Sequence, residues 1–376
     1  MQQKLISLAI GATLLSAGGA MAQEVVKIGY VGPLSGQSAH LGTDTSNGAR
    51  LAVEDLNAKG FKIDGKPVKF VLMAEDDAAE PKQATAAAQK LADQKVNGVI
   101  GHQTSGTSIP ASRIYYNAGI PQISASATSP VYTRQKFNTT FRVVANDLKL
   151  GGTLGKYAVQ NLGAKRIAVI DDRTAYGMGV ATEFVKAAKG AQIVDKQFTN
   201  DKATDFNAIL TSIKSKNPDL VFFGGMDSVG GPLLRQMKAL GIKTKLMGGD
   251  GICTEAMPKL AGPTAGDDSV VCAEAGGVTP AQQKKMEEFA GRYKKRYGQE
   301  LQIYAPYSYD AVMAMATAMA NAKSANPKQY LPFLSKVSYP GITGTIAFDP
   351  AGDIKDGALT LFTFRGGKKT LIEVVK

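Results

Sequence analysis

The sequence predicts an α/β protein that contains two parallel-sheet domains. Short apolar strands alternate with turns rich in Gly, Ser, Thr and Asp and with amphipathic helices. This pattern is typical of βαβ units whose helices cover both faces of a sheet. The alternation occurs in two series that are separated near residues 141–148. The chain has 376 residues, which exceeds the size at which a single hydrophobic core stops growing.

Each strand of the two series is a short apolar run that precedes a helix. In the first series, strands are expected at 25–31, 68–73 and 99–101, followed by helices at 43–58, 81–94 and 110–118. In the second series, strands are expected at 166–170, 220–223 and 245–247, followed by helices at 179–188, 229–240 and 255–260. Ligands of such sheets bind beyond the carboxyl ends of the parallel strands.

The C-terminal part of the chain has no strand–helix alternation of its own. Long helices are expected at 280–297 and 306–322, and strands at 342–348 and 358–364. We therefore expect this part to complete the first two domains rather than to form a third.

The first 22 residues have the pattern of a secretory signal peptide. Lys4 and the amino terminus are positively charged, residues 5–17 form a short apolar run, and Ala20-Met21-Ala22 is a signal-peptidase pattern. The run is too short for a membrane span, and no cysteine near the cleavage site would carry a lipid. We expect a mature protein that begins at Gln23 and is exported to the periplasm.

Composition and motifs exclude several functions. The 44 Lys and Arg residues exceed the 32 acids, but they are scattered over predicted helix surfaces, so a solvated basic face is expected rather than a nucleic-acid partner. The sequence contains no Gly-x-Ser-x-Gly elbow, Walker loop or His-Glu-x-x-His motif. With only two His and two Cys residues, we expect no His/Cys metal site, and no cofactor.

The two cysteines, Cys253 and Cys272, are an even count in a chain bound for an oxidising compartment. We predict that they form a disulfide that closes a loop of about 20 residues.

Hydroxyl-bearing loops follow two strands of the first series. In the loop at 101–108, Ser108 is expected to cap a helix whose first turn holds Pro110, so that free amides and the positive dipole end face an anion. Ser105 adds a hydroxyl there, although these residues are equally compatible with a simple helix cap. The loop at 123–130 exposes Ser126 and Thr128, or else it is only a turn.

Two further candidates follow strands of the second series. Tyr176 is either a loop aromatic or a pocket wall, and Asp250, in a glycine-rich turn, is either a ligand-binding carboxylate or an Asx-turn residue. Gly177-Met178-Gly179 matches only the start of a dinucleotide fingerprint, because Thr182 replaces its third glycine. We therefore expect no nicotinamide site.

Ordered blocks along the whole mature chain resemble the periplasmic Leu/Ile/Val-binding proteins of ABC transporters, which have the type I periplasmic binding fold. The blocks are KIGYVGPLSG at 27–36, DD at 76–77 with PKQA at 81–84, VIGH at 99–102, PAS at 110–112, YG at 176–177, FGG at 223–225, LRQ at 234–236 and GGDG at 248–251. The resemblance implies two doubly wound parallel-sheet lobes joined by a three-segment hinge, with an amino acid trapped between them. We expect lobe 1 at 23–144 plus 276–345, and lobe 2 at 145–275 plus 346–376.

The resemblance also implies roles for individual residues. Ser105, Ser126 and Thr128 match positions that hold the ligand's α-carboxylate. The carbonyl of Ser126, together with Thr128 and Asp250, matches the groups that hold the α-ammonium. Tyr176 matches an aromatic residue that closes over the ligand from lobe 2.

Some positions depart from the pattern of the family and leave the side-chain preference open. Leu41 stands where an aromatic residue often covers the ligand, and Met226 stands where tyrosine is common. Tyr304 matches an aromatic residue of the side-chain pocket. Asp250 is one methylene shorter than the glutamate of well-known members.

The sequence thus predicts a non-enzymatic, monomeric receptor that binds a branched-chain or other apolar amino acid and delivers it to an inner-membrane ABC permease. A first alternative is a receptor on the same fold for an aromatic acid, an amide or another small organic ligand. A second is an exported hydrolase that uses Ser105 or Ser126 with His102, although the sequence places no acid beside this histidine.

Overall fold

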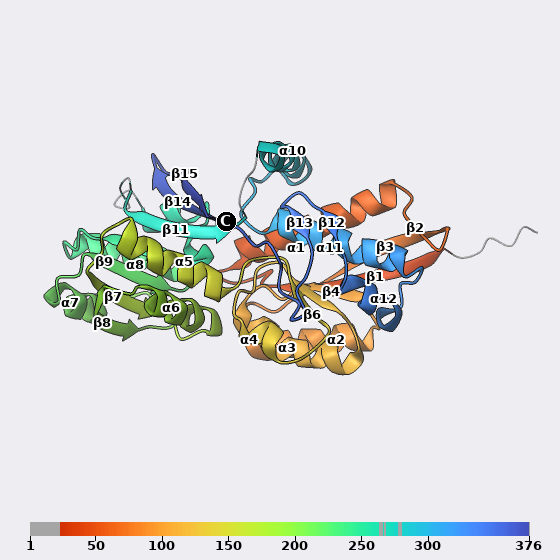
Figure 1. Ribbon diagram of the computed structural model, residues 1–376, viewed down its shortest axis with the longest axis horizontal. Helices are drawn as coiled ribbons and strands as arrows, with labels where there is room; N and C mark the ends of the chain where they lie inside the picture. The colour runs from red at the N-terminus through yellow and green to blue at the C-terminus, as the bar shows by residue number, and fades with distance from the viewer. Residues whose placement is uncertain (1–22, 263–265, 267, 277–279, 376) are drawn as a thin grey trace, which may run out of the picture.

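The computed structural model describes residues 23–262, 266, 268–276 and 280–375. Two lobes lie side by side, each built around a twisted sheet flanked by helices (Figure 1). The predicted α/β class with two parallel-sheet lobes is confirmed. The predicted signal peptide lies outside the described residues.

The first sheet has the order β2-β3-β1-β4-β5-β6. All its neighbouring strands pair in parallel except β2 and β3, which form an antiparallel hairpin. Its strands are β1 (Glu24–Gly32), β2 (Lys62–Ile63), β3 (Lys66–Asp76), β4 (Gly98–Gly101), β5 (Gln122–Ser124) and β6 (Thr140–Arg142).

The second sheet has the order β15-β14-β11-β10-β9-β7-β8. The strands from β8 to β11 are parallel, whereas β14 and β15 add an antiparallel hairpin at one edge. Its strands are β7 (Arg166–Asp171), β8 (Gln192–Phe198), β9 (Leu220–Gly224), β10 (Lys245–Gly248), β11 (Val270–Ala275), β14 (Leu359–Arg365) and β15 (Lys368–Val375). A separate pair, β12 (Tyr339–Pro340) and β13 (Thr345–Ile346), lies near α11.

Helices connect most successive strands. They are α1 (Ala39–Ala58), α2 (Pro81–Asp93), α3 (Ser105–Ala118), α4 (Val131–Arg134), α5 (Asp147–Gln160), α6 (Ala175–Ala187), α7 (Asn207–Ser215), α8 (Asp227–Ala239), the 3-10 turn η1 (Asp250–Ile252), α9 (Met257–Ala261), α10 (Pro280–Tyr297), α11 (Ala305–Asn321) and α12 (Pro327–Leu334). No helix of the described ranges is long and apolar enough to cross a membrane.

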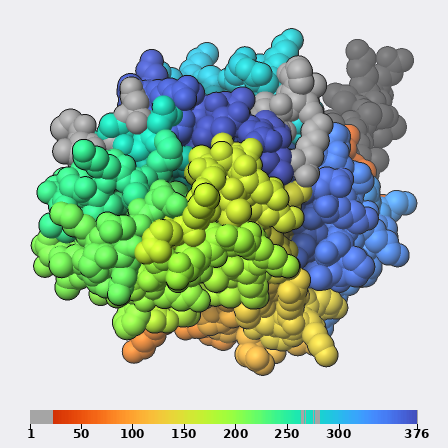
Figure 2. All heavy atoms as spheres, turned by 60° about the vertical axis from the view of Figure 1, so that its left-hand side comes forward, coloured from red at the N-terminus to blue at the C-terminus, as the bar shows by residue number. Residues whose placement is uncertain are grey.

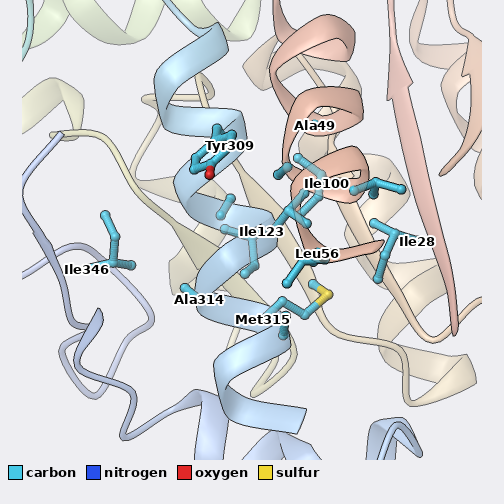
Figure 3. Close-up of a cluster of buried hydrophobic side chains, with 14 of the residues drawn as sticks. Ile28, Ala49, Leu56, Ile100, Ile123, Tyr309, Ala314, Met315 and Ile346 are labelled. Carbon is cyan, nitrogen blue, oxygen red and sulfur yellow. The ribbon is translucent and has the colours of Figure 1, made fainter. Parts of the chain in front are cut away.

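Alternating strand residues build a separate core on each face of the first sheet. Ile28 and Ile100 point to one face, where they pack against side chains of α1 and α11 such as Leu56 and Met315 (Figure 3). Val31 and Val99 belong to the core on the other face, which includes side chains of α2 and α3. Burial on both faces explains why these strands are almost continuously apolar.

The C-terminal segments complete both lobes, as the sequence predicts. Helix α11 packs on α1 in the first lobe, whereas β14 joins the second sheet. In the space-filling view, blue segments from the end of the chain lie against the green second lobe as well as the first (Figure 2).

The chain passes between the two sheets three times: between β6 and β7, after β11, and before β14. Main-chain hydrogen bonds hold the crossings in place, and two of them tie the first crossing to β5 and the loop that follows it. Val143 N donates to Ser124 O at 3.1 Å, and Asp147 N donates to Thr128 O at 2.9 Å. Gly276 N donates to Ala358 O at 2.8 Å, so the second and third crossings are also tied.

Two local expectations are wrong. Helix α3 begins at Ser105 and is capped by Thr104, whose Oγ1 accepts a hydrogen bond from Thr107 N, while Ser108 lies inside the helix and donates to His102 O. Pro110 is therefore inside the helix rather than in its first turn. The expected strand at 342–348 shrinks to β13, and beyond it only Phe348 forms an isolated bridge, to Ile354.

Candidate functional site

A small cavity of about 20 Å³ lies between the lobes, at the carboxyl ends of strands from both sheets. Its walls come from two segments of the first lobe, from three segments of the second and from the residue before α11. The lining residues are Gln103, Thr104, Ser105, Ser126, Tyr176, Met226, Asp250, Gly251 and Tyr304. It adjoins a wider vestibule of about 790 Å³, whose lining shares Thr104, Tyr176 and Met226 with it.

Among the described residues that line this cavity, Asp250 is the one acid, and it is 3% exposed. Tyr176 donates its hydroxyl to Oδ1 at 2.8 Å, and Tyr304 donates to Oδ2 at 2.7 Å from the opposite lobe. Burial raises the pKa of Asp250, and the two tyrosine hydrogen bonds offset part of this shift. A side chain at Gly249 would meet the Tyr176 hydroxyl at 2.7 Å, so a small residue is needed there.

The facing wall presents hydrogen-bond donors from the N-terminus of α3. Thr104 and Thr107 form a reciprocal capping box, which satisfies Thr104 N and Thr107 N. The amides of Ser105 and Gly106 have no acceptor within the described chain. Free amides at a helix N-terminus, with its positive dipole end, favour an anion such as a carboxylate.

The hydroxyls of Ser105 and Ser126 tie the loops of this wall together. Ser105 Oγ accepts a hydrogen bond from Ser129 N at 3.1 Å, and Ser126 Oγ donates to Gln103 O at 2.6 Å. The loops after β4 and β5 therefore hold each other in place.

The structure brings six of the eight predicted ligand-binding residues to the cavity and leaves Leu41 and Thr128 off its lining. Leu41 is fully buried and packs with Ile303, Tyr304 and Met226, so it supports the wall from behind. Thr128 is also buried, and its hydroxyl has no hydrogen-bond partner in the described part of the chain. The six that line the cavity are Ser105, Ser126, Tyr176, Met226, Asp250 and Tyr304.

Asp147 is a second buried acid near the cleft, and no sequence pattern predicted it as a site residue. It begins α5, and neither of its carboxylate oxygens has a hydrogen-bond partner among the described residues. Burial, with a smaller contribution from the Asp250 charge, raises the pKa of Asp147 to about 7; the nearby Thr128 hydroxyl partly opposes the shift. An acid inside the break between the two strand–helix series, at 141–148, is the signal that could have identified it.

His102 is held in a way that the sequence did not predict. Asp77 Oδ2 lies 2.9 Å from Nδ1 of His102, although no acid was expected beside it, and Tyr115 Oη lies 3.1 Å from Nε2. All three side chains are buried. Both ring nitrogens of His102 thus have a hydrogen-bond partner. Among the described residues, neither Ser105 nor Ser126 forms a hydrogen bond with the ring. This arrangement is that of a structural histidine.

Cys253 and Cys272 form a disulfide, as predicted, with their Cα atoms 5.3 Å apart. Among the residues with described positions, no group of three or more His, Cys, Asp or Glu side chains is placed to hold a metal ion.

Two α/β lobes of this topology that meet over a small cavity define a binding protein of the two-lobed class. The chain belongs to the periplasmic binding protein family, whose sequence model matches residues 25–368. Leu/Ile/Val-binding protein homolog 1 of Brucella abortus is 32% identical over 371 residues, covering 98% of this chain and 97% of that protein. The leucine-specific-binding protein of Salmonella typhimurium is 34% identical over 358 residues, covering 94% and 95%.

Solved structures give the same fold. The branched-chain amino acid transporter substrate-binding protein LivJ of Streptococcus pneumoniae, in complex with isoleucine, has a TM-score of 0.84 and 29% identity, covering 94% of this chain and 99% of that one. An R. palustris solute-binding protein in complex with benzoate has a TM-score of 0.81 at 21% identity, covering 93% and 96%; this likeness concerns the fold alone.

Proposed function

We propose that this protein is the substrate-binding receptor of an ABC importer and that its ligand is an amino acid held between the lobes. The observation that carries the proposal is the presence of two complementary groups at the cavity. The Asp250 carboxylate lies on one wall, and the free amides at the start of α3 lie on the other. A zwitterion matches both, with its ammonium at Asp250 and its carboxylate at Ser105 and Gly106.

The hydroxyls around the cavity extend this clamp. Ser105 and Ser126 supply further polar contacts to the carboxylate, and the carbonyl of Ser126 together with Thr128 supports the ammonium after small loop shifts. Tyr176 and Tyr304 give up or share their hydrogen bonds to Asp250 when the ammonium arrives. Because the cavity of about 20 Å³ is smaller than an amino acid, the lobes must part to admit one and close again around it.

The family and the pattern of the first 22 residues support a wider setting for this proposal. The receptor is made with a signal peptide of residues 1–22, begins at Gln23 after cleavage, and works as a monomer in the periplasm with an inner-membrane permease. Lobe 1 comprises 23–144 and 276–345, and lobe 2 comprises 145–275 and 346–376, so that the three crossings form the hinge. Relatives named for leucine, isoleucine and valine make branched-chain amino acids the first ligands to test.

A second candidate is a receptor for an organic acid without an ammonium group. It is favoured by one observation: both oxygens of Asp250 already accept tyrosine hydroxyls, so a ligand without an ammonium does not leave this carboxylate unpaired.

Thermal unfolding of the mature protein with each of the twenty amino acids, and with a set of aromatic acids, tests both candidates. A ligand at 100 times its dissociation constant stabilises the folded state by about 2.7 kcal/mol, which raises the unfolding temperature measurably. Stabilisation by amino acids alone supports the proposal, and stabilisation by aromatic acids alone supports the second candidate. An ester panel tests for hydrolysis, and turnover there would contradict both.

A further inference from the structure

Gln103 places a side-chain amide at the wall of the central cavity. The residue follows β4, directly precedes the cap residue of α3, and is only 3% exposed. Its carbonyl oxygen accepts the Ser126 hydroxyl at 2.6 Å, so its backbone is tied to the loop after β5. Gln103 is therefore a fixed part of the wall and not a mobile surface side chain.

One end of this amide is already engaged by the first helix. Thr45 Oγ1, on α1, lies 2.7 Å from the amide oxygen of Gln103 and 2.8 Å from the carbonyl oxygen of Leu41. The other end of the amide has no hydrogen-bond partner among the described residues, although the residue lines the cavity. Whichever end Thr45 holds, the opposite end offers a polar group to a ligand.

An aliphatic ligand side chain placed against this group would leave it buried and unpaired. The free energy lost when a buried polar group has no partner is larger than the net free energy gained when it forms a hydrogen bond. Such a site therefore discriminates strongly against a ligand that lacks the matching polar group.

We propose that Gln103 makes this receptor selective for amino acids whose side chain carries a hydroxyl or an amide group over aliphatic amino acids of the same shape. The inference rests on the proposed function, because Gln103 lines the cavity in which that function places the amino acid. Threonine and valine form one isosteric pair, and asparagine and leucine form another. A hydroxyl or amide both donates and accepts, so it pairs with either end of the Gln103 amide.

The test is calorimetric titration of the mature protein with these four amino acids. The wild-type protein is expected to bind threonine more tightly than valine, and asparagine more tightly than leucine, by about tenfold in each pair. Gln103→Leu is expected to reverse both preferences, and Thr45→Val, which frees the amide end that it positions, to reduce them. Gln329→Leu, on the exposed face of α12, is the matched control and keeps the wild-type ratios.

Each outcome decides a different claim. Equal or tighter wild-type binding of valine and leucine overturns the selectivity, as does a Gln103→Leu protein with unchanged ratios. Binding of none of the four, or of any other amino acid, overturns the proposed function instead. If Gln103→Leu does not fold, Gln103→Met, which keeps the length of the side chain, takes its place, and the wild-type ratios still decide the question.

Discussion

Nε2 of His40 lies 2.9 Å from Oδ2 of Asp227, and this contact joins the start of α1 in the first lobe to the first turn of α8 in the second. Asp227 is fully buried, and its Oδ2 also accepts the Thr254 hydroxyl. The charged groups that act on His40 are Asp227 and, on its own helix, Asp44. Burial is the largest single effect and opposes protonation of His40, but the hydrogen bond to Asp227, the charge of Asp227 and a backbone hydrogen bond with Gln37 together outweigh it and raise the pKa of His40.

The first prediction follows from this contact between the lobes. Protonated His40 stabilises the closed arrangement; its contribution is complete below the ordinary histidine pKa and is lost as the pH rises through the raised pKa. Ligand affinity is expected to be about two- to fivefold higher at pH 5.5 than at pH 8.5, a modest effect because His40 is partly exposed. Calorimetry on wild-type and His40→Gln protein measures it. A variant with the same pH dependence as wild type would show that His40 does not contribute.

The second prediction concerns Asp250. Asp250→Asn keeps the size of the side chain and removes its charge, so it is expected to weaken amino-acid binding by about 10- to 150-fold. The same change is expected to spare the deaminated form of the ligand, which has no ammonium to pair. Calorimetry with both ligands measures the difference, and Asp64→Asn, at an exposed turn whose positive φ suits asparagine, is the control. Equal affinity of both proteins for the amino acid would remove Asp250 from the clamp.

The third prediction concerns Asp147, which is buried without a hydrogen-bond partner in the described structure. Because its pKa is raised to about 7, the protein loses stability as the pH rises from about 4 to about 7, where the unfolded chain ionises this acid more readily. Asp147→Asn removes this loss, and it is expected to stabilise the protein by up to about 4 kcal/mol at pH 8 and much less at pH 4.5. Thermal unfolding at the two pH values checks it; a gap between the proteins that does not widen at pH 8 contradicts the assignment.

The fourth prediction concerns the disulfide between Cys253 and Cys272. It closes a loop across 19 positions of the sequence, in the core of the second lobe. Its loss in a double Cys→Ala variant is expected to cost about 3 kcal/mol of stability by releasing the unfolded chain. Thermal unfolding measures this cost, and a reductant should lower the unfolding temperature of wild type but not of the variant. Mass spectrometry without reductant provides a direct check, since two free thiols in fresh periplasmic protein would refute the pairing.

Sequence patterns were sufficient to predict those strands and helices whose apolar residues follow a regular spacing along the chain. Strands such as β1 and β9 are buried on both faces and therefore appear as continuous apolar runs. Strand β8 was missed because it lies at the edge of its sheet, where its side chains are partly exposed and no apolar run is required. Helix α3 begins early because Thr104 and Thr107 cap each other, a local pairing that Pro110 obscured.

What the sequence by itself determined was the class of fold and the loops that supply the site, because parallel strands must end in loops at one edge of each sheet. Ser105, Ser126, Tyr176 and Asp250 were found in this way. Only the tertiary structure decided which groups face one another: Tyr304 reaches Asp250 across 54 positions of sequence, and His40 reaches Asp227 across 187. No local pattern encodes such pairs, because the two residues meet only when the lobes pack against each other.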